Sequence, residues 1–195
     1  MPSTGFEAVP GVATDVGRPE AGAVVMTFGG TSVADVEQIL TVARRLAAAR
    51  DAGRRVVGVL SAIGSTTTEL VDLAREVSPN PHEREFDMLV SVGERVSCAL
   101  TAMVLIDLGY DAISLTGSQA GIVTDAAHGK AKVVEVRARR VREALDRGTI
   151  VLVAGFQGVS TDAEVTTLGR GGSDTTAAAL ATALRADLCE DVSYG

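Results

Sequence analysis

The sequence has few of the residues that mark several common classes of protein. It contains no tryptophan, two tyrosines and four phenylalanines among 195 residues, which argues against an aromatic platform on which nucleic-acid bases stack. The 25 acidic and 18 basic residues give a net charge of −7, so neither nucleic acid nor an anionic membrane surface is an expected partner. We therefore expect any anionic ligand to be held by local arginines and backbone amides.

Cysteine and histidine are also scarce. Cys98 and Cys189 form no C-x-x-C pattern, and we expect both to be reduced thiols in the core of a cytoplasmic protein. His82 and His128 have no partners at the spacing of metal ligands, so no metal site is expected. The N-terminus lacks the pattern of a signal peptide, and no apolar run approaches the roughly 20 residues that cross a bilayer.

Apolar strands alternate with amphipathic helices along most of the chain. Residues 1–22 are rich in proline, glycine and alanine without a period, so we expect a flexible tail there and one domain over 23–195. Strands are predicted over 23–28, 56–60, 112–115, 132–136, 149–154 and 186–190, and the runs over 23–28 and 149–154 indicate buried strands. Helices are predicted over 33–52, 69–77, 83–108, 139–147 and 174–185. This alternation predicts an α/β fold, a three-layer αβα sandwich with a mainly parallel sheet.

Segments rich in glycine and hydroxyl groups follow several of the predicted strands. In Gly29-Gly30-Thr31-Ser32 the glycines allow close approach to an anion, although a simple tight turn explains this segment equally well. Ser32 is expected to cap the next helix, with Asp35 completing a capping box. Two further segments of this kind are 61–67 and 116–121.

The most informative segment is 169–176, GRGGSDTT, at the end of a predicted polar loop over 155–173. Arg170 can hold a carboxylate with two hydrogen bonds, whereas Asp174 on its own fits a simple helix cap. From spacing alone Glu94 fits a solvated surface partner of Arg95 or Arg84. The chain has no Walker motif, no G-x-G-x-x-G after a strand and no G-x-S-x-G. The loops therefore indicate a small acidic or phosphorylated ligand.

In order, these segments resemble the N-terminal part of the catalytic domain of the aspartate kinases, in the amino-acid kinase superfamily. The matching stretches are FGGTSVA (28–34), SAIGSTT (61–67), REFDML with SVGER (84–95), TGSQAG (116–121), FQGV (156–159) and VTTLGRGGSDTTA (165–177). Such enzymes use ATP with Mg²⁺ to phosphorylate the side-chain carboxylate of aspartate, in the biosynthesis of lysine, threonine and methionine. The resemblance implies ATP with Mg²⁺ as cofactor and aspartate as the small-molecule ligand.

The resemblance also implies roles for individual residues. Glu94 would accept the substrate ammonium, Arg170 would hold a substrate carboxylate, and Asp174 would orient the catalytic lysine. With such a ligand, burial of Glu94 becomes the favoured interpretation. The implied substrate-binding residues are Ser61, Thr67, Glu94, Arg170, Gly171 and Ser173. The implied phosphate-binding residues are Phe28, Gly29, Gly30 and Thr31. The implied catalytic positions are Gly30, Asp174 and Thr27.

Two departures from the family pattern bear on activity. Thr27 stands where the family has a lysine that neutralises charge on the transferred phosphoryl group, and losing such a group typically costs on the order of 10²–10³-fold in rate. After Glu190 the family continues into a nucleotide-binding segment, whereas this sequence reads DVSYG, so a truncated nucleotide lobe is expected. The alternatives to an active kinase are a catalytically impaired amino-acid-binding module and a partner subunit, either as a homo-oligomer or with another chain.

Overall fold

The structure is a computed structural model that describes residues 22–192; residues 1–21, which make up almost all of the predicted tail, lie outside the described part. Its main sheet has five strands in the order β3-β6-β2-β1-β9, and every pairing in it is parallel. The strands are β1 (Ala23–Phe28), β2 (Arg55–Leu60), β3 (Ala112–Leu115), β6 (Ile150–Ala154) and β9 (Leu188–Val192). Strands β1 and β6 are buried along their whole length, which is why the sequence shows them as continuous apolar runs.

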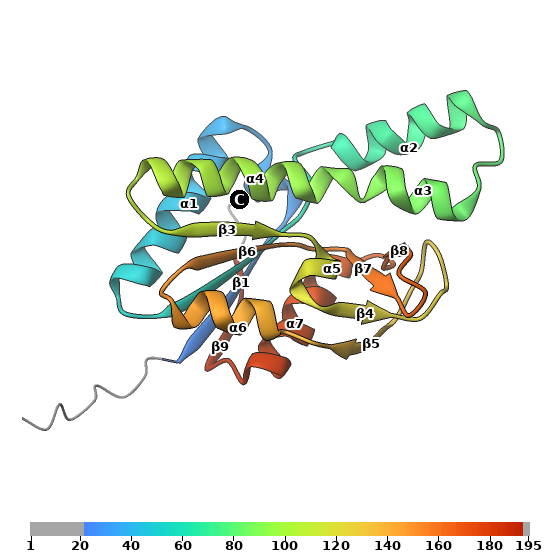
Figure 1. Cartoon of the computed structure of the whole chain (residues 1–195). Coiled ribbons are helices and arrows are strands. Elements are labelled where there is room, and N and C mark those ends of the chain that lie inside the picture. The colour runs from blue at the N-terminus through green and yellow to red at the C-terminus, as the bar shows by residue number, and fades with distance from the viewer. Residues whose placement is uncertain (1–21, 193–195) are drawn as a thin grey trace, which may run out of the picture.

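Helices cover both faces of this sheet (Figure 1). On one face α1 (Val36–Asp51) and α4 (Val92–Asp107) form a core cluster with side chains such as Met26 and Phe28. On the other face α6 (Arg139–Asp146) and α7 (Gly172–Leu184) pack against side chains such as Val25. Successive residues of a strand point to opposite faces, so β1 contributes to both clusters. The predicted three-layer αβα sandwich with a mainly parallel sheet is confirmed.

A second sheet lies beside the first and was only partly predicted. Its order is β5-β4-β7-β8, with β5 (Val133–Val136), β4 (Ile122–Thr124), β7 (Gln157–Ser160) and β8 (Val165–Thr167). The expected polar loop over 155–173 is wrong, because β7 and β8 form an antiparallel hairpin within it. Short elements such as β4 and α5 (Gly117–Ala120) give too few residues for a hydrophobic period.

Three helices also differ from the prediction in their boundaries. Asp35, not Ser32, caps α1, because its side chain accepts a hydrogen bond from the N–H of Gln38 at 2.9 Å. Ser32 lies in the short 3₁₀-helix η1 (Gly30–Val33), and its hydroxyl donates to the carbonyl of Val192. The expected helix over 83–108 is divided at Ser91 into α3 (Glu83–Val90) and α4. The remaining helix, α2 (Thr66–Val77), begins three residues earlier than predicted.

Contrary to the expectation from the sequence, one stretch, Glu83–Asp107, is long and apolar enough to cross a membrane by length and composition alone, but half of its most apolar window is buried inside the fold. That burial is typical of a core helix in a folded domain. Cys98 on α4 is buried, as expected of a core thiol. Cys189 on β9 is exposed, so its prediction as a core thiol is wrong; β9 lies at the margin of the sheet, where neither face is fully covered.

Candidate functional site

The loops that follow β1, β2 and β6 meet the start of α7 at one end of the main sheet. Together with the first turns of α2 and α4 they enclose a cavity of about 240 Å³. The cavity is lined by Gly29, Ser61, Thr67, Glu94, Phe156, Gly169, Arg170, Gly171, Gly172, Ser173 and Asp174. Parallel sheets bind ligands at the carboxyl ends of their strands, and this is where the cavity lies.

Backbone hydrogen bonds and close approaches hold these loops together. The N–H of Ser61 donates to the carbonyl of Phe28 at 3.0 Å, and the N–H of Gly155 donates to that of Leu60 at 3.1 Å. Gly155 lets the next loop come close, because a Cβ there would lie 2.6 Å from Oγ of Ser173. The hydroxyl of Ser173 is in turn 2.9 Å from that of Ser61. Two of the predicted substrate-binding hydroxyls therefore form a pair in the cavity wall.

Glu94 is the most deeply buried charged residue in the cavity wall. Its side chain belongs to the first turn of α4 and is 3% exposed, so the surface interpretation made from spacing alone is wrong. The preceding Gly93 allows this position, because a Cβ there would lie 2.6 Å from Cβ of Ala62. Backbone hydrogen bonds from Ala62 and from Glu94 itself reach the carboxylate, while its Oε2 has no hydrogen-bond partner.

The electrostatic state of Glu94 follows from this burial. Loss of hydration raises the pKa of its carboxyl to about 7, and the backbone hydrogen bonds and the neighbouring Arg95 offset only part of that effect. A buried carboxylate oxygen without a partner is costly in any folded protein. A cationic group placed in the cavity would supply the missing hydrogen bond and favour the ionised form.

The opposite wall of the cavity is a glycine-rich turn that carries a guanidinium group. Arg170 is exposed, and within residues 22–192 its side chain has no hydrogen bond or ion pair. Gly171 has a φ of +73°, a left-handed conformation that favours glycine, and it precedes α7 directly. The turn packs on Phe156, which has a φ of 66° although it is not glycine. Such strain is often found at functional sites.

Asp174 and Thr27 connect the cavity to β1. The hydroxyl of Thr27 donates to Oδ1 of Asp174 at 3.4 Å, although Thr27 itself does not line the cavity. Asp174 lies in the first turn of α7 and is exposed. The helix cap expected for Asp174 is not formed, because Gly171 occupies that position. Among the residues that line the cavity, Arg170 is the one cation.

Most of the predicted site residues gather in this cavity. All six predicted substrate-binding residues line it, as do Gly29 and Asp174. Phe28 is fully buried in the core, where its side chain supports the loop and is not in contact with the cavity. Gly30 and Thr31 lie in η1 beside the cavity and do not line it. Sequence reasoning missed Phe156, Gly169 and Gly172 as lining residues, although each lies inside a quoted motif.

A second buried carboxylate fixes the region next to the cavity. Asp87 of α3 is fully buried and accepts hydrogen bonds from Thr167 Oγ1 at 2.5 Å and from the N–H groups of Thr167 and Gly129. Nδ1 of His128 lies 2.7 Å from its Oδ2. Asp87 therefore joins α3, the loop before β5 and strand β8, whose next residues lead into the glycine-rich turn. Its role was not predicted from the sequence.

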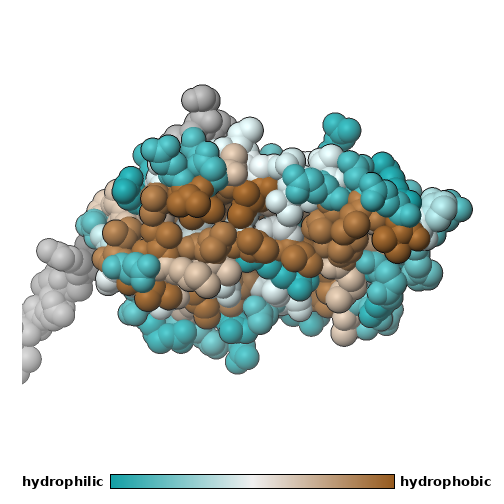
Figure 2. Space-filling model, turned by 90° about the horizontal axis from the view of Figure 1, so that it is seen from above, coloured by the Kyte–Doolittle hydropathy of each residue, from teal (hydrophilic) through white to brown (hydrophobic). Residues whose placement is uncertain are grey.

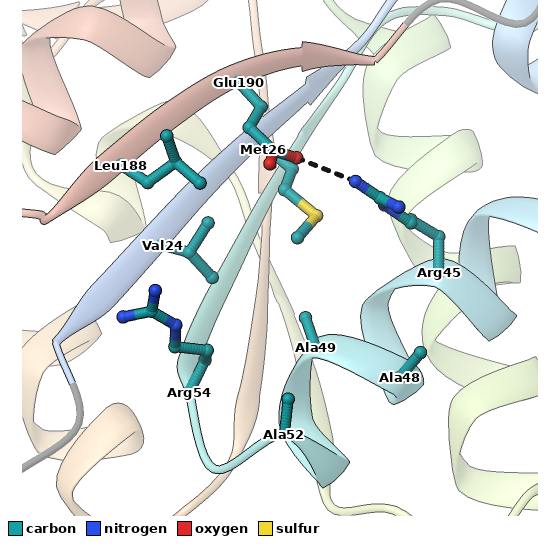
Figure 3. A pocket seen from close by; sticks show the side chains of 9 residues that line it. All are labelled: Val24, Met26, Arg45, Ala48, Ala49, Ala52, Arg54, Leu188 and Glu190. Carbon is teal, nitrogen blue, oxygen red and sulfur yellow. Dashed lines mark hydrogen bonds and ion pairs between the residues drawn. The ribbon is translucent and has the colours of Figure 1, made fainter.

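A separate hollow of about 320 Å³ lies between α1 and the β1–β9 margin of the sheet (Figure 3). Val24, Met26 and Leu188 give it an apolar floor. Its two arginines are already paired, Arg45 with Glu190 at 3.1 Å and Arg54 with Asp187 at 3.1 Å. The hollow thus offers no unpaired charge, in contrast to the cavity at the glycine-rich turn.

Comparison with known proteins agrees with this geometry. The family model "Amino acid kinase family" matches residues 22–193. Over 168 residues the chain is 60% identical to an aspartokinase of Mycolicibacterium smegmatis, and this alignment covers 86% of this chain and 40% of that protein. It is 55% identical over 169 residues to an aspartokinase of Geobacillus stearothermophilus, covering 87% and 42% of the two chains. The chain thus spans about two-fifths of the length of these curated relatives.

Solved structures give the same result. An aspartate kinase from Synechocystis superposes with a TM-score of 0.76 at 47% identity, covering 89% of this chain and 28% of that one. E. coli aspartokinase III in complex with aspartate and ADP superposes with a TM-score of 0.77 at 28% identity, covering 87% and 48%. With its fold, its glycine-rich loops and these similarities, the chain belongs to the amino acid kinase family.

Proposed function

We propose that this chain supplies the aspartate-binding part of an aspartate kinase, which uses ATP to phosphorylate the side-chain carboxylate of L-aspartate to 4-phospho-L-aspartate. One observation carries the proposal: a single cavity holds a buried carboxylate with an unpartnered oxygen, Glu94, and an unpaired guanidinium, Arg170. A free amino acid carries an ammonium and a carboxylate, and these two groups complement it. The relative from E. coli has aspartate bound in its solved structure.

In this proposal each wall of the cavity binds one part of the amino acid. Glu94 accepts hydrogen bonds from the ammonium, which satisfies its unpartnered Oε2. Arg170 holds a carboxylate through two parallel hydrogen bonds. Ser61, Thr67 and Ser173 add hydroxyl groups, and the N–H groups near Gly171 add donors at the start of α7. Holding the acceptor carboxylate in one orientation is, together with charge neutralisation, what a protein contributes to such a transfer.

The phosphate groups of ATP fit the loop after β1. A Cβ at Gly29 would meet no atom within 4 Å, so its backbone is open to a ligand on the cavity side. Gly30 lies close to the next loop, because a Cβ there would be 3.2 Å from the carbonyl oxygen of Ala62, a tight contact. Thr31 is exposed beside them. Mg²⁺ bound with the phosphates would neutralise their charge, and Asp174 is the exposed carboxylate at this position.

Thr27 gives a specific reason to keep a second candidate function. It has a hydroxyl but no charge, and it is hydrogen-bonded to Asp174. In the second candidate the chain binds an amino acid and takes part in catalysis only with another subunit, or not at all. A substitution separates the two: if the missing charge limits turnover, Thr27→Lys raises the rate on the order of 10²–10³-fold. An unchanged rate with intact aspartate binding favours the binding module.

The proposal is tested by binding and by product trapping. Isothermal titration calorimetry with aspartate, and separately with Mg-ATP, measures the two ligands independently. Aspartyl hydroxamate formed from ATP and aspartate in the presence of hydroxylamine measures phosphoryl transfer. Glu94→Gln is expected to abolish the heat of aspartate binding. Glu76 is an exposed glutamate on α2, so Glu76→Gln is expected to leave that heat unchanged. Absence of aspartate binding by the unaltered chain, with the fold intact by circular dichroism, refutes the proposal.

The biosynthetic step and the cellular location of the chain belong to the same proposal. An aspartate kinase supplies the phosphorylated precursor of lysine, threonine and methionine, and we place this chain in that biosynthetic step. We also propose a cytoplasmic location, where ATP and aspartate are available together. Both follow from the proposed reaction, so a failure of aspartate binding removes them as well.

A further inference from the structure

Glu94 and Arg170, which bind the amino acid in the proposed function, come from different parts of the fold. Glu94 lies in the first turn of α4, whereas Arg170 follows β8 at the end of the β7–β8 hairpin. The outer face of α4 is apolar, as the brown band in Figure 2 shows, and its buried polar side chains, such as Glu94, face inward. On this inner side α4 meets Gln157 of β7, which connects the helix to the hairpin.

The side-chain amide of Gln157 binds the start of α4 at two points. Its Nε2 donates to the carbonyl of Ser91 at 2.6 Å, and its Oε1 accepts from Nε of Arg95 at 3.2 Å. Nη2 of Arg95 also donates to the hydroxyl of Ser91 at 3.2 Å, which closes the network. Gln157 is 1% exposed and Ser91 is fully buried. Because Glu94 lies between Ser91 and Arg95 in the chain, the network fixes the turn of helix that carries it.

The backbone of Gln157 belongs to the opposite wall of the cavity. Gln157 pairs with Thr167 of β8, three residues before Arg170. The preceding residue, Phe156, lines the cavity, and its carbonyl accepts a hydrogen bond from the N–H of Leu168 at 2.8 Å. Gln157 therefore contacts the helix that carries Glu94 through its side chain and the hairpin that leads to the glycine-rich turn through its backbone.

Hydrogen bonds distinguish this contact from ordinary packing. An apolar side chain of similar volume would fill the same space without the cost of burying an amide. Hydrogen bonds are directional, so a fully bonded amide holds the helix and the hairpin in one relative position. Asp87 fastens the same hairpin to α3 through Thr167, whereas the two residues that flank Glu94 contact Gln157.

We propose that Gln157 is a positioning residue of the aspartate site: it fixes the start of α4 relative to the glycine-rich turn, and so fixes Glu94 relative to Arg170. The inference rests on the proposed function. One aspartate molecule binds to both side chains, so a displacement of either wall weakens one of its two charged contacts. Gln157 does not line the cavity, and it acts on the ligand through these two residues.

Isothermal titration calorimetry with aspartate tests this role through a double-mutant cycle. Gln157→Leu removes both side-chain hydrogen bonds at nearly unchanged volume and should weaken aspartate binding about 10-fold or more. In the Arg170→Ala background one wall holds the ligand, so the same substitution should weaken binding by about 3-fold or less. A role in folding alone predicts equal losses in both backgrounds.

Val42→Ala is the control for a loss of stability, because Val42 is fully buried on α1 and takes no part in the network. Its aspartate affinity should stay within about 2-fold of that of the unaltered chain. Gln157→Met provides a second variant should Gln157→Leu disturb the fold, as monitored by circular dichroism.

The outcomes separate this inference from the proposed function. Equal losses in the two backgrounds, an unchanged affinity of Gln157→Leu, or an equal loss in Val42→Ala overturns the positioning role and leaves the proposed function intact. Absence of aspartate binding by the unaltered chain overturns both.

Discussion

Replacing Glu94 with glutamine is expected to stabilise the ligand-free protein above neutral pH. Burial raises the pKa of this carboxyl from 4.5 to about 7. Between these two pH values the folded state keeps a proton that the unfolded state has released, so the stability of the protein falls as the pH rises. The gap of about 2.5 pH units corresponds to about 3 kcal/mol, which is fully lost by about pH 8. Glutamine does not titrate, so the variant lacks this loss.

The size of the effect is read from the difference between two curves. The free energy of unfolding in urea, followed by far-UV circular dichroism from pH 5 to pH 8, is compared for the unaltered chain and Glu94→Gln. Every other group titrates in both proteins and cancels in the difference. Glutamine places an amide where Oε2 has no partner, which costs about 1 kcal/mol at every pH and leaves the slope unaffected. Parallel curves for the two proteins would refute the assignment of the raised pKa to Glu94.

Three further substitutions test the site and its support. Arg170→Ala should weaken aspartate binding about 10- to 100-fold by calorimetry, through loss of a charge-assisted pair of hydrogen bonds, while Arg140→Ala on the exposed face of α6 leaves the affinity unchanged. Gly155→Ala should lower the free energy of unfolding by about 1–3 kcal/mol, because its Cβ would lie 2.6 Å from Oγ of Ser173; equal stability would show that the loop yields freely. Asp87→Ala should cost about 3–5 kcal/mol, since several buried donors lose their acceptor, and a loss below about 1 kcal/mol in urea titrations would contradict that role.

The main sheet was predictable because its strands are buried on both faces. Such strands appear as continuous apolar runs, and β1 and β6 were located within one residue at each end. Of the second sheet only β5 was predicted, because β4 and β8 have three residues each and owe their conformation to pairing with neighbouring strands. Strand propensity and the period of hydrophobic residues carry little information over a stretch of three residues.

Most residues that line the cavity could be predicted from the sequence, whereas their burial and their contacts could not. The glycine-rich turn at Arg170 has a composition that a helix cap does not explain, and it lines the cavity. Glu94 shows the limit of spacing: its burial depends on the approach of Ala62, which is allowed by the missing side chain at Gly93. Asp87 shows the same limit, because its hydrogen-bond partners come from distant segments. Tertiary contacts of this kind leave no periodic pattern in the sequence.

The partners of Asp87 also bear on the order of events during folding. They lie 41, 42 and 80 residues away along the chain, so the cluster closes only after long loops have lost their conformational freedom. Contacts of that range slow the search for the native topology, and we expect them to form after the main folding barrier. Substitution of Asp87 should then accelerate unfolding and leave the refolding rate nearly unchanged, which makes this carboxylate a determinant of the lifetime of the folded state.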